Sequence, residues 1–375
     1  MPNISDSKRI VIKIGSALLV DKKSGQIRRG WLETLAEDIA RLRARGQEVV
    51  VVSSGAIAVG RRHLKLSSGR LRLEESQAAA ATGMVRLAHA YQEVLARHEL
   101  TLAQVLITLD DSENRRRYIN ARNTLDTLLR LGAVPLINEN DTVATDEIRF
   151  GDNDRLAARV AAMISADMLV ILSHMDGLYD RDPTADSDAV HVPLIEGEIS
   201  AEIEAMAGSG KSADGTGGMI TKLAAAKIAL GAGTRMAIAN GTQDHAIGRI
   251  EQGARCTWFL PTANPKTARK QWIAGSLKPN GALVVDAGAL GALKSGKSLL
   301  PAGVTAIKGR FDRGDAITIH SPEGIEIGRG IVAYSAEDAR KIIGNKTSEI
   351  ESILGYRGRD EMIHRDDLAL SWVKQ

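Results

Sequence analysis

The chain has 375 residues, of which 44% are hydrophobic and 25% charged, as is typical of a soluble globular protein with room for two domains. The formal net charge of +3 is too small to favour nucleic acid or an anionic membrane as the main partner, and 3% aromatic residues are too few for a surface that stacks on single-stranded bases. One cysteine, Cys256, cannot close an internal disulfide. The sequence has no apolar run of membrane-spanning length and no signal-peptide pattern at its start. We therefore expect a cytoplasmic protein without a transmembrane helix.

The first 240 residues alternate between short apolar runs and amphipathic segments. The pattern predicts strands at 10–14, 49–52, 105–107, 134–137, 168–172 and 236–239, and helices at 31–45, 120–131, 155–164 and 220–230. Strands that are apolar throughout and separated by helices are typical of a parallel sheet covered on both faces. The predicted fold is therefore α/β, a three-layer sandwich around a mainly parallel sheet.

The composition changes near residue 260. Pro261, Pro265 and Pro279 lie in a polar stretch that is typical of a linker. Beyond it glycines are dense, and short strands are predicted at 283–285, 306–308, 316–319 and 331–334. This part of the chain is expected to form a small, mainly β domain.

Clusters of small and polar residues follow four of the predicted strands. The clusters are Lys13 with Gly15 and Ser16, residues 53–56, residues 138–141, and Ser173 with His174. Ligands of open α/β sheets bind beyond the carboxyl ends of the strands. Four clusters at equivalent positions predict one shared binding site better than four independent turns.

Lys13 lies inside the first predicted strand, between Ile12 and Ile14. Burying an ammonium group is costly unless it is paired or meets an anion. Two interpretations stay open: an edge-strand lysine whose head reaches water, or a cation that meets a transferring phosphate.

A glycine-rich loop precedes the predicted helix at 220–230. It contains Gly-Ser-Gly-Lys-Ser at 208–212 and Thr-Gly-Gly-Met at 216–219. Backbone N–H groups of such a loop, together with a helix N-terminus, bind phosphate well, and Lys222 lies one turn into the helix. A flexible surface loop is the alternative, but the position between two sheet elements favours phosphate.

A second segment, residues 291–298, fits the P-loop pattern G-x-x-x-x-G-K-[ST] in full. That mechanism needs a buried parallel strand before the loop and a long helix after it. Pro301 and Gly303 follow within a few residues, so we interpret the match as coincidental.

Asp152, Asn153 and Asp154 follow Gly151 at the start of the predicted helix 155–164. One of the three side chains suffices to cap the helix. We expect one carboxylate of the group to hold catalytic lysines in position.

Together these motifs resemble the amino-acid kinase family, and within it the members that phosphorylate glutamate. The matching segments, in the family's order, are residues 11–16, 53–58, 138–143, 151–154, 177–179 and 215–219 with Lys222. Residues 280–355 resemble a PUA domain, and residues 356 and 364–367 extend the resemblance. The expected domains are an amino-acid kinase domain at 1–260, a linker at 261–279, a PUA-like domain at 280–355 and a C-terminal tail at 356–375.

The resemblance implies that ATP and L-glutamate give γ-glutamyl phosphate and ADP, the first step of proline synthesis. It implies that Lys13 and Lys222 neutralise the transferring phosphoryl group and that Asp154 organises both lysines. The implied substrate residues are Ser54, Gly55, Ala56, Asp141 and Asn153, with Asp141 attracting the ammonium group and Asn153 fixing the carboxylate. The implied ATP residues are Lys13, Gly15, Ser173, His174, Thr216, Gly217, Gly218, Met219, Ile220, Thr221 and Lys222.

The resemblance also implies Mg2+ bound to ATP, proline as a feedback inhibitor and a homo-oligomer, either dimer or tetramer. The sequence has no histidine spacing typical of a protein-held metal. One departure from the family is that Ser173-His174 stands where Thr-Asp is usual, so His174 cannot supply a carboxylate to the nucleotide side.

Two alternatives remain. A kinase for N-acetylglutamate or aspartate is one, and Asp141 argues against an acetylated substrate because it suits a free ammonium group. An RNA-binding protein is the other, because PUA domains often bind RNA; the small net charge argues against that as the main role.

Overall fold

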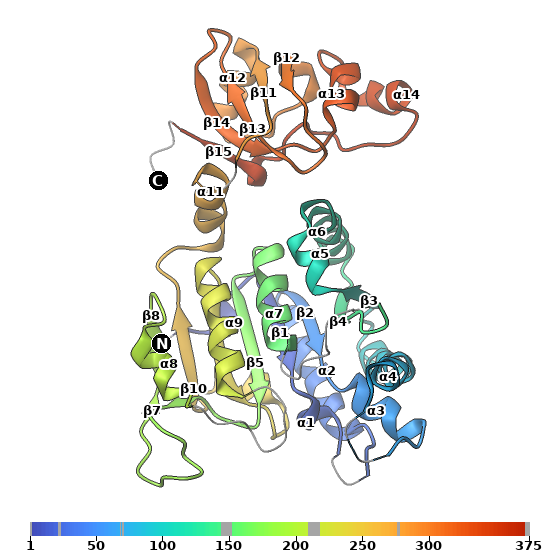
Figure 1. Cartoon of the computed structure of the whole chain (residues 1–375), viewed down its shortest axis with the longest axis vertical. Coiled ribbons are helices and arrows are strands. Elements are labelled where there is room, and N and C mark those ends of the chain that lie inside the picture. Colours follow the sequence, from blue (N-terminus) through green and yellow to red (C-terminus); the bar gives the residue numbers. More distant parts are fainter. Residues whose placement is uncertain are drawn as a thin grey trace. The chain divides into compact units, whose positions relative to one another are not determined.

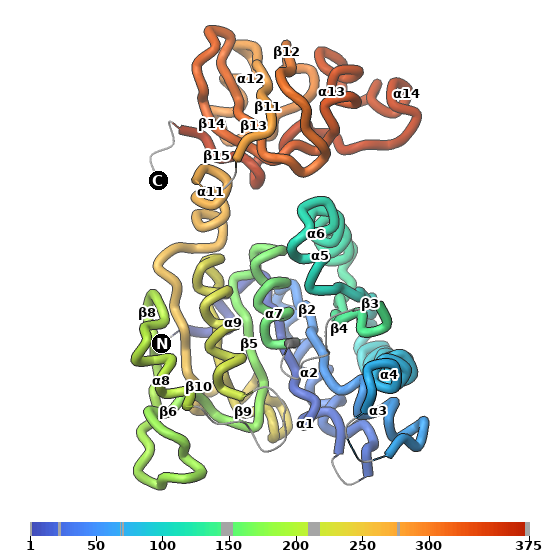
Figure 2. Tube along the Cα trace, in the orientation of Figure 1, coloured from blue at the N-terminus to red at the C-terminus, as the bar shows by residue number. Residues whose placement is uncertain are grey.

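A computed structural model describes residues 2–21, 24–67, 69, 71–143, 152–208, 218–275 and 278–371. The chain divides into two compact units, Met1–Pro265 and Lys266–Gln375. Each unit has its own sheet and its own apolar core (Figure 1; Figure 2). No helix in the described part of the chain is long and apolar enough to cross a membrane.

An eight-stranded sheet forms the centre of unit 1, in the order β3-β4-β2-β1-β5-β9-β10-β8. Its strands are β1 (Arg9–Ile14), β2 (Glu48–Ser53), β3 (Leu102–Ile107), β4 (Val134–Glu139), β5 (Met168–Ser173), β8 (Leu194–Glu196), β9 (Arg235–Asn240) and β10 (Cys256–Leu260). All neighbours pair in parallel except β9 with β10. The predicted fold class is confirmed.

Alternate residues of the central strands enter two different cores, one on each face of the sheet. Ile10, Ile12 and Ile14 of β1 lie in the first core, whereas Val11 lies in the second. This period of two follows from strand geometry, and the burial of both faces explains why the strands are apolar throughout.

Helices cover both faces. The first core includes residues of α2 (Arg29–Ala44), α4 (Leu73–Ala96) and α10 (Ala246–Glu251). The second includes residues of α6 (Arg115–Arg130), α7 (Asp152–Met163) and α9 (Met219–Gly231), and Figure 1 shows α7 and α9 side by side. Shorter elements complete unit 1: η1 (Ile4–Asp6), α1 (Ser16–Leu19), α3 (Ala56–His63), α5 (Leu109–Glu113), β6 (Leu178–Tyr179), β7 (His191–Val192) and α8 (Ala201–Met206).

Helices α3 and α4 cross at very short range because each contributes a glycine. A Cβ atom on Gly60 would lie 1.8 Å from the carbonyl oxygen of Ala79, and one on Gly83 would lie 1.8 Å from that of Ala56. Any side chain at Gly60 or Gly83 would push the helices apart.

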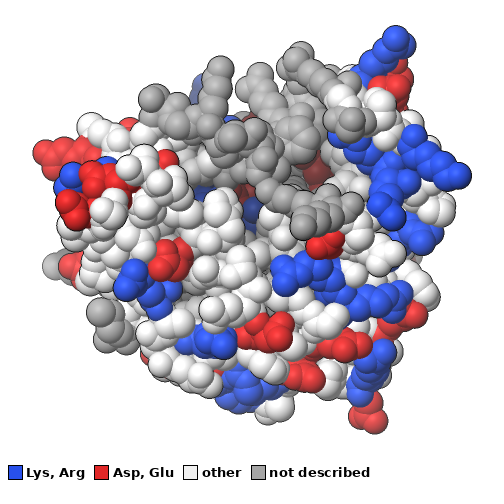
Figure 3. Space-filling view, turned by 90° about the horizontal axis from the view of Figure 1, so that it is seen from below, with Lys and Arg blue, Asp and Glu red and all other residues white. Residues whose placement is uncertain are grey.

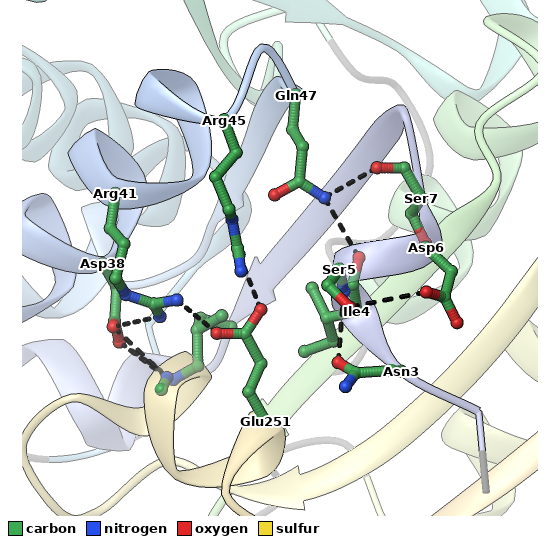
Figure 4. Close-up of polar contacts among 12 residues, drawn as sticks. Asn3, Ile4, Ser5, Asp6, Ser7, Asp38, Arg41, Arg45, Gln47 and Glu251 are labelled. Carbon is green, nitrogen blue, oxygen red and sulfur yellow. Dashed lines mark hydrogen bonds and ion pairs between the residues drawn. The ribbon is translucent and has the colours of Figure 1, made fainter.

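Helix α2 meets α10 through a buried polar network (Figure 4). The carboxylate of Asp38 accepts hydrogen bonds from the backbone N–H groups of Ile247, at 3.0 Å, and Gly248, at 3.2 Å. Arg41 donates to Asp38 at 2.8 Å and also pairs with Glu251, which lies 2.6 Å from Arg45. These bonds satisfy backbone donors at the start of a helix, which makes the network structural.

Three sequence expectations for unit 1 are corrected. The strand at 236–239 does not complete the sheet, because β10, which follows it in the chain, and β8, which precedes it, extend the sheet beyond β9; both strands are short, so periodicity does not reveal them. Periodicity also does not identify α4, although it has 24 residues, and α6 begins five residues before the predicted start because Asn114 caps it.

Unit 2 is built on a five-stranded sheet in the order β12-β11-β13-β14-β15. Its elements are α11 (Pro265–Gly275), β11 (Gly281–Val285), α12 (Ala287–Lys294), η2 (Pro301–Gly303), β12 (Val304–Gly309), β13 (Ala316–His320), β14 (Glu326–Ile331), α13 (Ala336–Ile342), η3 (Thr347–Glu349), α14 (Ile350–Leu354), η4 (Arg365–Asp367) and β15 (Leu368–Leu370). The strand predicted at 331–334 is wrong, because the chain leaves the sheet at Ile331.

The polar stretch expected to be a linker, 261–279, holds the helix α11. Arg269 on this helix donates to the carboxylate of Asp367 at 2.6 Å, and both side chains are buried. The apparent P-loop at 291–298 begins inside α12 rather than after a strand, so its backbone cannot form a phosphate loop.

Candidate active site

Two lysines and one aspartate form a buried charge cluster in unit 1. Lys13 Nζ lies 2.6 Å from Asp154 Oδ1, and Lys222 Nζ lies 3.2 Å from Asp154 Oδ2. Asp154 is 0% exposed, and the two lysines are 6% and 5% exposed. Among the contacts of the described residues, two ammonium groups share this one carboxylate, so the three side chains together carry an excess positive charge.

The local structure explains why these three side chains meet. Lys13 follows Val11 by two residues on β1, so it points to the face of the sheet on which α7 and α9 pack. Asp154 lies in the first turn of α7, and Lys222 lies in the first turn of α9. Parallel strands bring these helix starts to the same edge as the end of β1. Lys13 is therefore a lysine of a central strand, and the edge-strand interpretation is wrong.

The pKa values of Asp154 and Lys222 are shifted in the cluster. Burial alone would raise the pKa of Asp154, but Lys13 and Lys222 together hold it below its usual range. Burial lowers the pKa of Lys222, and the positive charge of Lys13 lowers it further, against the opposing pull of Asp154. Both shifts are what an unbalanced cluster of two cations and one anion produces.

Helix α9 presents its first turn to the same carboxylate. Gly218 is the N-cap residue of α9, and the hydroxyl of Thr221 lies 2.9 Å from Asp154 Oδ2 and 2.8 Å from the Gly218 carbonyl. Met219 is half-buried and Ile220 is 50% exposed. Thr216 and Gly217, predicted to bind ATP, lie outside the described residues.

A second group of predicted residues meets beside the cluster. The amide of Asn153, the neighbour of Asp154, donates to Ser54 Oγ at 2.9 Å and to the Ser53 carbonyl at 3.1 Å. Gly55, with φ of 103°, is the N-cap of α3, and Ala56 is its first residue. Only glycine adopts this φ without strain, so the motif needs glycine at this position. Ser54, Gly55, Ala56 and Asn153 therefore form one polar corner.

Asn138 belongs to this corner; the sequence predicts it as part of the polar cluster 138–141 but gives it no individual role. Its side-chain oxygen lies 3.2 Å from the Asn153 amide, and its own amide donates to Met84 Sδ at 3.3 Å. Its position at the end of β4, within a polar cluster, is a signal in the sequence that could have identified it.

Asp141 follows β4 and is 6% exposed. Among the described residues it has no hydrogen-bond or ion-pair partner, and burial raises its pKa to about 6. A buried carboxylate without a counter-charge suits a cationic ligand group.

The remaining predicted residues follow β1 and β5. Gly15 donates its N–H to the Leu172 carbonyl across a long 3.4 Å bond, so here it faces the backbone of β5. Ser173 is buried and its hydroxyl accepts from the N–H of Met175 at 3.2 Å, whereas His174 is exposed. These residues are not joined to the lysine cluster by any bond that the structure describes.

Figure 3 shows the molecule from below in the orientation of Figure 1, which is the side at which β5 ends and α9 begins. Lys and Arg are interspersed with Asp and Glu over the described part of this face.

Known proteins resemble this chain over almost its whole length. Residues 8–240 match the amino acid kinase family, and residues 281–354 match the PUA domain. The chain is 64% identical to a glutamate 5-kinase of Paramagnetospirillum magneticum over 99% of this chain and 100% of that protein. It is 59% identical to a glutamate 5-kinase of Rhodospirillum rubrum over 96% of each, and 57% identical to one of Rhodopseudomonas palustris over 99% of each. The chain therefore belongs to the amino acid kinase family.

Proposed function

We propose that this protein is a glutamate 5-kinase, which transfers the γ-phosphoryl group of ATP to the side-chain carboxylate of L-glutamate. The products are L-glutamyl 5-phosphate and ADP, and the reaction is the first step of proline biosynthesis. The observation that carries the proposal is the buried Lys13–Asp154–Lys222 cluster, in which an excess positive charge is held in place by one carboxylate. Relatives at 57–64% identity over almost the whole chain support the choice of substrate.

The chemistry needs positioning and charge rather than a protein nucleophile. An oxygen of the substrate carboxylate attacks the γ-phosphorus, a new O–P bond forms, and the bond from that phosphorus to the β–γ bridging oxygen breaks. Negative charge spreads over the phosphoryl oxygens and the leaving ADP in the transition state. Lys13 and Lys222 are placed to stabilise that charge, because Asp154 fixes both ammonium groups before the reaction begins.

The polar corner supports the acidic substrate. Ser54, the backbone of Gly55 and Ala56, and the Asn153 amide would hold a carboxylate, and Asp141 would hold the α-ammonium group. Gly218 to Lys222, with Thr216 and Gly217, would hold the phosphates of ATP at the start of α9. Gly15, Ser173 and His174 would complete the nucleotide side.

ATP would enter as its Mg2+ complex. Asp154 already pairs with two lysines, and the described residues hold no group of three or more His, Cys, Asp or Glu suited to a metal. A metal carried by the nucleotide fits such a site, since Mg2+ usually takes few protein ligands beside phosphate oxygens. Feedback inhibition by proline, a dimer or tetramer, RNA binding by the PUA domain and a cytoplasmic location remain predictions.

The test is to trap the acyl phosphate with hydroxylamine in the presence of ATP and Mg2+. The four acceptors are L-glutamate, L-aspartate, N-acetylglutamate and glutarate, each with and without proline. We expect strong trapping with glutamate, and weak trapping with glutarate because it has no ammonium group for Asp141. Trapping of aspartate or N-acetylglutamate without glutamate would show that the substrate is wrong.

A further inference from the structure

Tyr91 lies directly behind the polar corner, on helix α4. Its hydroxyl lies 3.1 Å from Ser53 Oγ, and the two residues are 1% and 0% exposed. Burial raises the pKa of Tyr91 above its usual range, so the phenol keeps its proton. Tyr91 has almost no surface for a ligand, so any effect on the site must pass through Ser53.

A short chain of hydrogen bonds leads from Tyr91 to the site. Ser53 Oγ donates to the Ser54 carbonyl at 3.2 Å, so it accepts from the phenol. The Ser53 carbonyl accepts from the Asn153 amide, which also donates to Ser54 Oγ. The phenol thus fixes the side chain of Ser53, whose backbone carbonyl and whose neighbour Ser54 both bind the Asn153 amide. Hydrogen bonds that meet at one residue orient one another more firmly than separate bonds would.

Helix α4 is a rigid support for this chain of bonds. Gly83 lies eight residues before Tyr91, so both are on the same stripe of the helix. The contact of Gly83 with the Ala56 carbonyl leaves no room for a Cβ atom. Because α4 packs against α3 at this distance, the Tyr91 hydroxyl is held at a fixed depth behind Ser53.

We propose that Tyr91 is a positioning residue for the acidic substrate: through Ser53 it holds the Ser54 hydroxyl and the Asn153 amide in the arrangement that binds the substrate carboxylate. The inference rests on the proposed function and assigns a role to a residue that does not touch the substrate. Its effect belongs to glutamate binding rather than to ATP, because the bonds around Tyr91 and Ser53 lead to Ser54 and Asn153, the residues proposed to hold the substrate carboxylate.

The test is Tyr91→Phe, measured as separate KM values for glutamate and ATP in the hydroxylamine assay. A neutral hydrogen bond is worth about 1 kcal/mol, so the glutamate KM is expected to rise roughly three- to ten-fold. The ATP KM should stay unchanged and kcat should fall less than about two-fold, because uniform binding is what is lost. Tyr334→Phe is the matched control: Tyr334 is also buried, and its hydroxyl donates to the Arg359 carbonyl in unit 2.

Ser53→Ala tests the same bond from its other end and carries the test if Tyr91→Phe does not fold. It should raise the glutamate KM in the same way, and the double variant should raise it little further, because both changes remove one interaction. A purely structural role for Tyr91 would lower the melting temperature without this split between the two KM values.

The outcomes are distinct. A glutamate KM within two-fold of wild type in Tyr91→Phe, or in Ser53→Ala, overturns the inference, as does an equal rise in both KM values. A rise in Tyr334→Phe equal to that in Tyr91→Phe also overturns it. A wild-type protein that traps no glutamyl phosphate overturns the proposed function, and the inference with it.

Discussion

Two buried aspartates lie on opposite faces of the large sheet, and they are satisfied in different ways. Asp38 on α2 accepts from backbone N–H groups of α10 and from one arginine (Figure 4). Asp154 on α7 meets two lysine side chains. Backbone donors carry no net charge, so Asp38 is balanced by Arg41 alone, whereas the cluster at Asp154 keeps a surplus positive charge. A buried carboxylate can thus hold the fold together, or it can hold cations ready for an anion.

The largest expected difference concerns the cations beside the two aspartates. Lys222→Ala leaves the ion pair between Lys13 and Asp154 in place, so the melting temperature should hardly change. Turnover should fall roughly 10²- to 10³-fold, the effect of removing one transition-state donor, measured by hydroxylamine trapping. Arg41→Ala is the matched change at Asp38 and should leave turnover unchanged while it lowers stability. Unchanged turnover in Lys222→Ala would remove Lys222 from the mechanism.

The aspartates themselves provide the next comparison. Asp38→Asn places an amide N–H against the N–H groups of Ile247 and Gly248, so unfolding free energy should fall by about 1–3 kcal/mol in urea titration. The kcat of the remaining folded protein should stay within about two-fold. Asp154→Asn should abolish most turnover instead. Equal loss of turnover in both variants would contradict the distinction between the two sites.

Asp141 is a third buried aspartate. Among the described residues it has neither a backbone donor nor a cationic side chain as a partner, and its role can be tested by changing the pH. Its pKa is raised to about 6, so the carboxylate that attracts the ammonium group is lost below that pH. The glutamate KM should therefore rise up to about ten-fold per pH unit below 6, while the ATP KM stays flat. In Asp141→Asn the glutamate KM should be high and independent of pH between 5 and 7.

The same shift has a consequence for stability. Because the folded pKa exceeds the unfolded value, the folded state binds more protons between about pH 4 and pH 6, and stability falls as pH rises through that window. Asp141→Asn should therefore be more stable than wild type above pH 6 and gain nothing near pH 4. Thermal melts of both proteins at pH 4.5 and 7.5 measure this; a wild type that is the more stable at pH 7.5 would show that Asp141 has a counter-charge.

The smallest effect is expected at the rim of the Asp38 network. Glu251 pairs with Arg41 and Arg45, whose side chains are more than a third exposed. Glu251→Gln should cost only about 0.5 kcal/mol, and the difference should shrink at 1 M salt. Turnover should not change. A loss comparable with that of Asp38→Asn would mean that the arginines, rather than the backbone donors, hold this network together.

The sequence by itself was sufficient for the α/β class, for six of the strands up to residue 240 (β1 to β5 and β9), for the family and for the polar clusters at the strand ends. Those features are local: an apolar strand, a glycine that needs a positive φ, a helix cap. Short strands such as β8 and β10 and the start of α6 could not be placed, because pairing partners and caps, rather than periodicity, define them.

Only the tertiary structure showed how Asp38 and Asp154 are each satisfied. In the sequence Asp38 and Asp154 are both aspartates in helices, and no nearby residue identifies their partners. Their difference arises from residues far along the chain: α10 brings N–H groups to Asp38, and α9 brings Lys222 to Asp154. Burial and the charge of the partner fix the role of a carboxylate, and both are set when the chain folds. The family resemblance already pointed to Asp154 with Lys13 and Lys222, and the fold added the contacts and the burial that hold these three side chains together.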